Sequence, residues 1–171
     1  INLGMFLNTK KEGELASVMC HELAHLSQRH YARSQNRSSP LANALMVLGS
    51  IAIAAASRNP EAIMIAPAAM QQMSINFTRS NEKEADRIGF NNLVKAGFDP
   101  SDMSSMFQRM QDKYQNEDSE EFSYLMTHPL PSERLTDMRI RAENLPESSK
   151  NSYRDNIDFY LMQKRVELWA E

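Results

Sequence analysis

The stretch His21-Glu22-Leu23-Ala24-His25 decides how the rest of the sequence is interpreted. In a helix, residues four apart lie one turn above each other on the same face, so His21 and His25 can aim imidazole nitrogens at one point. A tetrahedral Zn²⁺ needs such an arrangement, with Zn–N distances of about 2.1 Å. Glu22 lies beside that point, where it could take a proton from a water that attacks a carbonyl. The stretch therefore predicts two metal ligands and a general base.

The flanking residues predict that this stretch lies well inside a long helix, from about Lys10 to Gln35. Thr9-Lys10-Lys11-Glu12 has the form of a capping box, with Thr9 as the N-cap and Glu12 at N3. The helical period then separates an apolar stripe from a face with small and polar side chains. The stripe holds Leu15, Met19, Leu23 and Leu26, and the other face holds Ser17, His21, Ala24, His25 and Gln28. This context favours a metal site over a chance pairing of two histidines in a buried helix.

The composition sets the broad class of the protein. With 171 residues, the chain is long enough for a single domain with its own core. The net charge of −3 gives no attraction for nucleic acid phosphates, so no nucleic acid partner is expected. Cys20 is the single cysteine, which excludes an intrachain disulfide framework, and we interpret it as a small buried hydrophobe. The chain begins at Ile1 without a signal peptide, so it is either processed or a fragment.

The remaining sequence predicts one strand and several helices. Ile1–Leu7 alternates in part and is interpreted as a strand whose partners lie upstream. Leu41–Ser57 carries no charge and is rich in alanine; we interpret it as a helix packed over the active-site helix, with a membrane-contacting segment as the alternative. Pro60 begins another helix, which Pro67 should kink or end.

In the second half of the chain, several residues predict where helices end and begin. An amphipathic helix should run from Arg79 to Ala96, with Gly97 as its C-cap and Asp99-Pro100 opening the next helix. Further along we expect an acidic, solvated loop at Asn116–Glu121, a rigid turn at His128–Pro131 before a helix near Ser132, and a last helix from about Ser152.

Two histidines do not complete a zinc site, so a third ligand must come from elsewhere. A third histidine six residues after His25 is one known arrangement, but Tyr31 occupies that position. His30 lies one residue before that position, and we interpret it as a surface side chain. Glu82 and Asp86 offer the alternative, because they are four apart and share a helix face. Glu82 can bind the metal, and Asp86 can accept the N–H of a ligand histidine.

Together with His128-Pro129-x-x-x-x-Arg134, these motifs resemble the zinc metallopeptidase family that includes the CAAX prenyl protease and HtpX. Within that family the chain is most similar to the soluble, periplasmic BepA-like branch, and the likeness extends from Leu3-Gly4 to Arg134. The resemblance implies a mainly α fold with a small β-sheet (α+β), of the zincin-like metalloprotease type. It also implies strands upstream of the chain and a tetratricopeptide array downstream of it, so residues 1–171 would be a single protease domain cut from a longer protein.

The same resemblance implies the roles of the site residues. One zinc ion would be held by His21, His25 and Glu82, with Glu22 as the general base and Asp86 supporting a ligand histidine. His128 would either be a fourth zinc ligand that closes the resting site or a donor to the oxyanion, and Arg134 would hold the oxyanion or orient His128. The plain alternative for His128 is a turn residue that caps a helix.

The function implied is a zinc-dependent endopeptidase for misfolded or misassembled envelope proteins, in the periplasm and either soluble or peripherally attached to a membrane. Its partners would be polypeptide substrates and the outer-membrane assembly machinery, and an extended substrate could pair along the edge of Ile1–Leu7. Two alternatives stay open: a catalytically silent, zinc-bound chaperone or assembly factor, and a membrane-embedded protease that uses Leu41–Ser57 as a hairpin.

Overall fold

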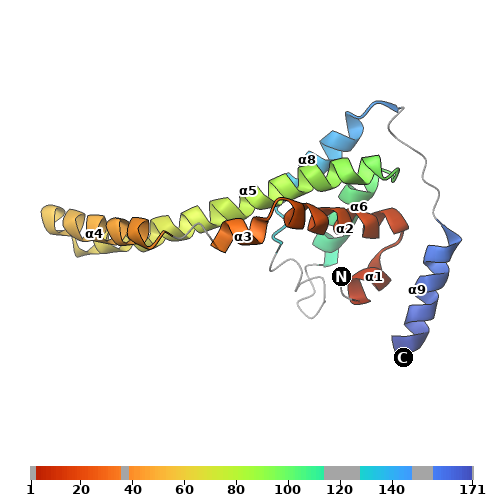
Figure 1. Cartoon of the computed structure of the whole chain (residues 1–171), viewed down its shortest axis with the longest axis horizontal. Coiled ribbons are helices and arrows are strands. Elements are labelled where there is room, and N and C mark those ends of the chain that lie inside the picture. The colour runs from red at the N-terminus through yellow and green to blue at the C-terminus, as the bar shows by residue number, and fades with distance from the viewer. Residues whose placement is uncertain (1–2, 36–38, 114–127, 148–155, 171) are drawn as a thin grey trace. The chain divides into compact units, whose positions relative to one another are not determined.

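The computed structural model describes residues 3–35, 39–113, 128–147 and 156–170 (Figure 1). Regular structure in those ranges is helical throughout, with no strand among them. The helices form two compact units, one made of Ile1–Ala24 and Lys83–Glu171 and the other of His25–Glu82. Helices α2 (Glu12–Ser27) and α5 (Ile65–Lys95) each contribute residues to both units.

The predicted small β-sheet is wrong. Ile1–Leu7 was expected to be a strand, but Leu3–Asn8 forms helix α1, and its Met5 is buried in the core of the first unit. A run of seven mostly apolar residues fits a short strand and a buried helical turn equally well, so its period does not decide between them. The expected pairing of an extended substrate along this edge is lost with the strand.

Contacts with the C-terminal helix hold α1 in place. Helix α9 (Ile157–Ala170) packs the ring of Phe159 edge-on against Phe6, with ring centroids 5.5 Å apart. The side-chain amide of Gln163 donates to the backbone carbonyls of Phe6 (2.8 Å) and Thr9 (2.9 Å). These bonds satisfy carbonyls at the end of α1 that the helix itself leaves unpaired. The helix expected from about Ser152 is described from Ile157 onward.

Helix α2 begins near the predicted start but ends earlier than predicted. Before it, the Thr9 hydroxyl donates to the Phe6 carbonyl (2.9 Å), and the Glu14 carboxylate accepts from the Lys10 amide (2.6 Å). The helix stops at Ser27, because Arg29 adopts a left-handed conformation (φ 53°), and helix α3 (His30–Gln35) follows.

The apolar stripe of α2 does not face the core. Leu23 and Leu26 are 55% and 74% exposed, and Met19 is also exposed. The buried positions belong instead to the face with small and polar side chains, at Gly13, Glu14, Ser17, Val18, His21 and Ala24. Small side chains let a neighbouring helix approach closely, so this face packs better than the bulky one. Cys20 is half-buried against the core, and burial raises the pKa of its thiol.

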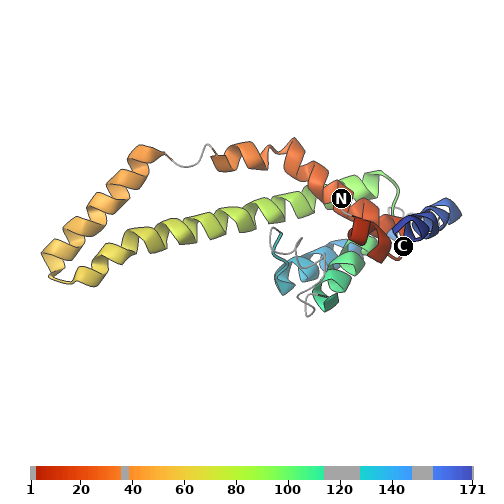
Figure 2. The same cartoon turned by 90° about the horizontal axis from the view of Figure 1, so that it is seen from below.

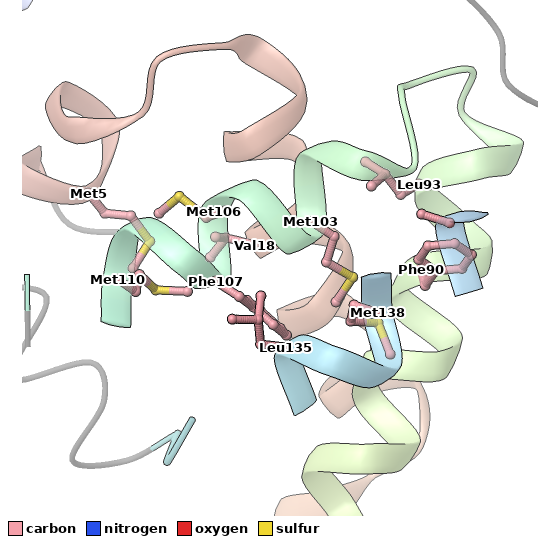
Figure 3. Packing of buried hydrophobic residues seen from close by; sticks show 11 residues of the cluster. Met5, Val18, Phe90, Leu93, Met103, Met106, Phe107, Met110, Leu135 and Met138 are labelled. Carbon is pink, nitrogen blue, oxygen red and sulfur yellow. The ribbon is translucent and has the colours of Figure 1, made fainter. Parts of the chain in front are cut away.

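The core of the first unit is rich in methionine (Figure 3). Helices α6 (Ser101–Lys113) and α8 (Ser132–Glu143) pack together there and meet α1, α2 and the second half of α5. The cluster consists of Met5, Val18, Phe90, Leu93, Met103, Met106, Phe107, Met110, Leu135, Met138 and Ala142. Unbranched thioether side chains fill irregular gaps well, which suits a core formed by several crossing helices.

The end of α5 agrees with the prediction. Gly97 has φ 84°, and the Phe98 amide bonds the Leu93 carbonyl (3.2 Å), as in a glycine-terminated helix. Asp99 Oδ1 then accepts from the Ser101 amide (2.8 Å) and caps α6. The acidic stretch Asn116–Glu121 lies outside the described residues.

The second unit contains a helical hairpin. Helix α4 (Pro40–Ser57) leads through the 3₁₀-helix η1 (Pro60–Met64) into the first half of α5, and Figure 2 shows the two long arms joined at that turn. Pro67 does not end α5, because it lies in the first turn, where a missing amide donor costs no hydrogen bond. Most of α4 is exposed, and by length and composition this helix is able to cross a membrane.

Candidate metal centre

His21 lies on the buried face of α2, where a carboxylate from α5 approaches its ring. Its Nδ1 lies 3.0 Å from Asp86 Oδ1, and both side chains are buried. Because Nδ1 faces Asp86, Nε2 is the ring nitrogen that can serve as a metal ligand.

His25, one turn later on α2, is approached from two sides within the second unit. Its Nε2 lies 3.3 Å from Glu82 Oε1, and its Nδ1 lies 2.8 Å from His30 Nδ1. The His25 and His30 rings are perpendicular, with centroids 4.8 Å apart. His30 is only 4% exposed, so the expectation of a surface side chain is wrong. The left-handed residue Arg29 breaks the helix and changes the direction in which His30 points.

The four predicted ligand side chains form one group that could hold a metal ion. His21, His25, Glu82 and His128 each offer one ligand atom, and these atoms lie within 4.8 Å of one another. Imidazole nitrogens and a carboxylate oxygen are the donors that catalytic zinc sites use. The donor set therefore fits zinc, with the Nδ1 atoms of His21 and His25 each facing a side chain outside the group.

Arg134 connects Asp86 to the turn that carries His128. Its guanidinium donates to both Asp86 oxygens, from Nε at 2.6 Å and from Nη2 at 2.7 Å, and its Nη1 donates to the Pro129 carbonyl at 2.6 Å. The guanidinium also lies 5.2 Å from the centre of the Phe107 ring. Burial alone would raise the pKa of Asp86, but the bonds and charges of His21 and Arg134 outweigh it and hold that pKa below its usual value.

His128 and Glu22 lie side by side within the first unit. The distance from His128 Nε2 to Glu22 Oε1 is 3.6 Å, and the His128 ring meets the His21 ring edge-on with centroids 5.5 Å apart. The Glu22 side chain is 38% exposed, so water can reach its carboxylate. Pro129 and Pro131 flank the turn and restrict its backbone before α8 begins at Ser132.

Comparison with known proteins identifies the family. The pattern of peptidase family M48 matches residues 1–142. The chain belongs to peptidase family M48. This M48 chain is 41% identical to the beta-barrel assembly-enhancing protease of Escherichia coli (strain K12) over 175 residues, which is 97% of the chain and 34% of that protein.

Two further relatives support the M48 assignment. The beta-barrel assembly-enhancing protease of Yersinia pestis is 42% identical over 165 residues (90% of this chain, 33% of that protein). The mitochondrial metalloendopeptidase OMA1 of Schizosaccharomyces pombe is 29% identical over 157 residues (92% and 43%). The M48 chain thus spans about a third of the length of the bacterial relatives, 34% and 33%.

Sequence reasoning missed two residues at this M48 site. His30 was misplaced because its position depends on a helix break at Arg29 that the sequence does not mark with glycine or proline. Gly89 was not singled out, although a glycine inside a helical pattern is a usable signal of close packing. A Cβ there would lie 3.0 Å from the His21 Cα and N atoms, so this glycine lets α5 approach the backbone of α2.

Proposed function

We propose that this chain is the catalytic part of a zinc-dependent endopeptidase, with His21, His25 and Glu82 as the metal ligands. The observation that carries the proposal is the group of four ligand atoms within 4.8 Å of one another. When bound, the zinc would polarise a scissile carbonyl and lower the pKa of water to about 7. Membership of an M48 peptidase family supports the same reaction class.

In this proposal Glu22 handles the proton. Its carboxylate lies next to the ligand His21 in the chain and is open to solvent, so it can accept a proton from the attacking water and pass it to the leaving amine. Asp86 holds the His21 ring through Nδ1 and stabilises it as a ligand. Arg134 then acts as a positioning residue, since all its hydrogen bonds named above go to Asp86 and Pro129.

We propose that His128 closes the resting site. It contributes a ligand atom to the same group as His21, His25 and Glu82, and its Nε2 lies 3.6 Å from Glu22 Oε1, the proposed base for the attacking water. A substrate would then have to displace His128, after which the same imidazole can donate to the oxyanion.

The substrates would be unfolded or misassembled polypeptides of the bacterial envelope. This assignment rests on the names of the bacterial relatives, which are beta-barrel assembly-enhancing proteases. The outer-membrane assembly machinery would be the partner, and the periplasm would be the compartment. The exposed apolar helix α4 supports a peripheral attachment to the membrane.

Cleavage of an unfolded protein such as reduced casein tests the proposal, with zinc content measured on the same samples. We expect about one zinc per chain, low activity in the wild type, higher activity in His128→Ala, and none in Glu22→Gln. Glu22→Gln should keep its zinc, because Glu22 is not a ligand. A Glu22→Gln variant as active as His128→Ala would refute the role of the base.

A catalytically silent assembly factor is the second candidate, and the presence of His128 in the ligand group favours it. In that case zinc would stabilise the fold, and no variant would cleave. Zinc bound at one per chain, together with no cleavage by His128→Ala, would select this function over the peptidase.

A further inference from the structure

The surroundings of His25 contain a polar contact that the proposed reaction does not use. Its Nδ1 lies 2.8 Å from His30 Nδ1, and the two rings meet at 82° with centroids 4.8 Å apart. His30 is almost fully buried. On its other side the His25 ring presents Nε2 to Glu82 Oε1 at 3.3 Å. The two ring nitrogens of His25 therefore have separate partners, both from the second unit.

The backbone is bent where this contact forms. In an unbroken helix, residues five apart point about 140° away from each other, so His30 could not meet His25. Arg29 adopts φ 53°, a conformation that residues other than glycine rarely take, and α3 starts directly after it. The chain thus accepts an unfavourable backbone conformation at the one position that turns His30 onto the His25 ring.

We propose that His30 is a positioning residue for the metal ligand His25, an inference that rests on the proposed zinc site. A histidine that binds a metal through Nε2 carries its proton on Nδ1. His25 Nδ1–H then donates to His30 Nδ1, and His30 holds its own proton on Nε2. The bond fixes the His25 tautomer and ring orientation, the role that Asp86 fills for His21 through a carboxylate. The two ligand histidines would have unlike supports, one anionic and one neutral.

Zinc affinity, measured by competition with a chromophoric chelator, tests this role without using activity. His30→Leu keeps the volume but removes the acceptor, and should raise the zinc Kd about 10- to 100-fold. His30→Asn places an amide oxygen near the position of Nδ1 and should stay within about threefold of the wild type. His30→Gln places its amide near the position of Nε2 instead, and should resemble His30→Leu. Tyr31→Ala, at an exposed neighbouring position on α3, should bind zinc like the wild type.

The cobalt(II)-substituted protein and the metal-free protein separate positioning from folding. The visible cobalt bands report ligand geometry, and they should shift in His30→Leu and His30→Gln but not in His30→Asn. Melting temperatures of the metal-free variants should agree within a few degrees.

The inference is overturned if the zinc Kd of His30→Leu lies within twofold of the wild-type value. It is also overturned if His30→Asn and His30→Gln raise the zinc Kd equally. Loss of folded protein in every His30 variant would also overturn it, because the role would then be structural. A wild-type chain that binds no zinc would refute the proposed function itself, which makes that failure distinguishable from a failure at His30 alone.

Discussion

At the scale of single residues, the buried pair Asp86–Arg134 has the largest effect that we expect on stability. Both side chains are buried and joined by two hydrogen bonds of 2.6 and 2.7 Å. Removing one member of such a pair typically costs about 3–5 kcal/mol, because the other charge stays buried without compensation. The same pair supports His21, so stability and metal binding should change together.

We predict that Arg134→Met lowers the free energy of unfolding by about 3–5 kcal/mol and weakens zinc binding. Arg134→Lys should lose less stability, since it keeps the charge but not the two-point contact. Urea denaturation at pH 7 measures the free energy of unfolding of both variants, and chelator competition measures their zinc affinity. Combining Arg134→Met with Asp86→Asn should recover part of the loss, and strictly additive losses would show that the two side chains do not interact.

Asp102 should make stability depend on pH. Burial raises its pKa to about 6, only partly offset by Lys11 at 3.4 Å. Between the ordinary carboxyl range near 4 and pH 6, the folded chain therefore binds more protons here than the unfolded chain does, so stability falls as pH rises through that window. Asp102→Asn should remove this slope: the free energy of unfolding of the variant minus that of the wild type should be larger at pH 7 than at pH 4.5. An equal difference at both pH values would contradict the prediction.

At the scale of secondary-structure elements, the distance between α2 and α5 depends on Gly89. A Cβ at this position would lie 3.0–3.1 Å from backbone atoms of Cys20 and His21, which cannot rotate away as a side chain can. Overpacking of this kind costs about 1–3 kcal/mol. The better helix propensity of alanine returns only about 1 kcal/mol, so the steric effect should decide.

We therefore predict that Gly89→Ala destabilises the chain and weakens zinc binding, because the helices must move apart beside His21. Gly49→Ala is the matched control: Gly49 has open space around its Cα in α4, and the substitution should stabilise by roughly 0.5–1 kcal/mol. Urea denaturation and chelator competition on both variants check this. A Gly89→Ala variant as stable as wild type would show that α5 adjusts at no cost.

Helix α4 is the part of the chain that we propose attaches to a membrane. Its 18 residues include no charge, and Leu41, Leu45 and Leu48 are exposed along one face. The wild-type chain should float with phosphatidylethanolamine–phosphatidylglycerol vesicles, and Leu48→Lys should release it, because a lysine at the centre of an apolar helix costs about 3 kcal/mol on insertion. Thr136→Lys, which adds the same charge to the exposed side of α8, should float like wild type. Wild-type protein that stays at the bottom of the gradient would exclude the attachment.

At the scale of the whole chain, metal binding should be linked to folding. The proposed ligands come from α2 and α5, so zinc would bind the folded chain and not the unfolded one. The melting temperature should rise with the free zinc concentration, as mass action requires, and removal of zinc by a chelator should lower it. Glu82→Gln should melt near the temperature of the chelated wild type, with or without zinc. A melting temperature unchanged by chelation would argue against metal binding.

The motif spacing named the residues of the candidate site, while the predicted β-sheet was wrong. Residues four apart on a helix must share a face, and that rule alone paired His21 with His25 and Glu82 with Asp86. The ligand roles themselves stay predictions. Ile1–Leu7 was misassigned because its short apolar run has no decisive period. The buried face of α2 was also mispredicted, because it depends on how closely the neighbouring helix packs against each face. Such choices are made by tertiary contacts, which one sequence does not display.

Arg134 links the support of His21 to the turn that carries His128. One guanidinium binds the carboxylate behind His21 and also the carbonyl of Pro129, directly after His128. A displacement of that turn would move Arg134, and through Asp86 it would also move the imidazole of His21. If a polypeptide displaces His128 as proposed, the position of the His21 ring would therefore change in the same step, and the binding energy of the substrate would drive both movements.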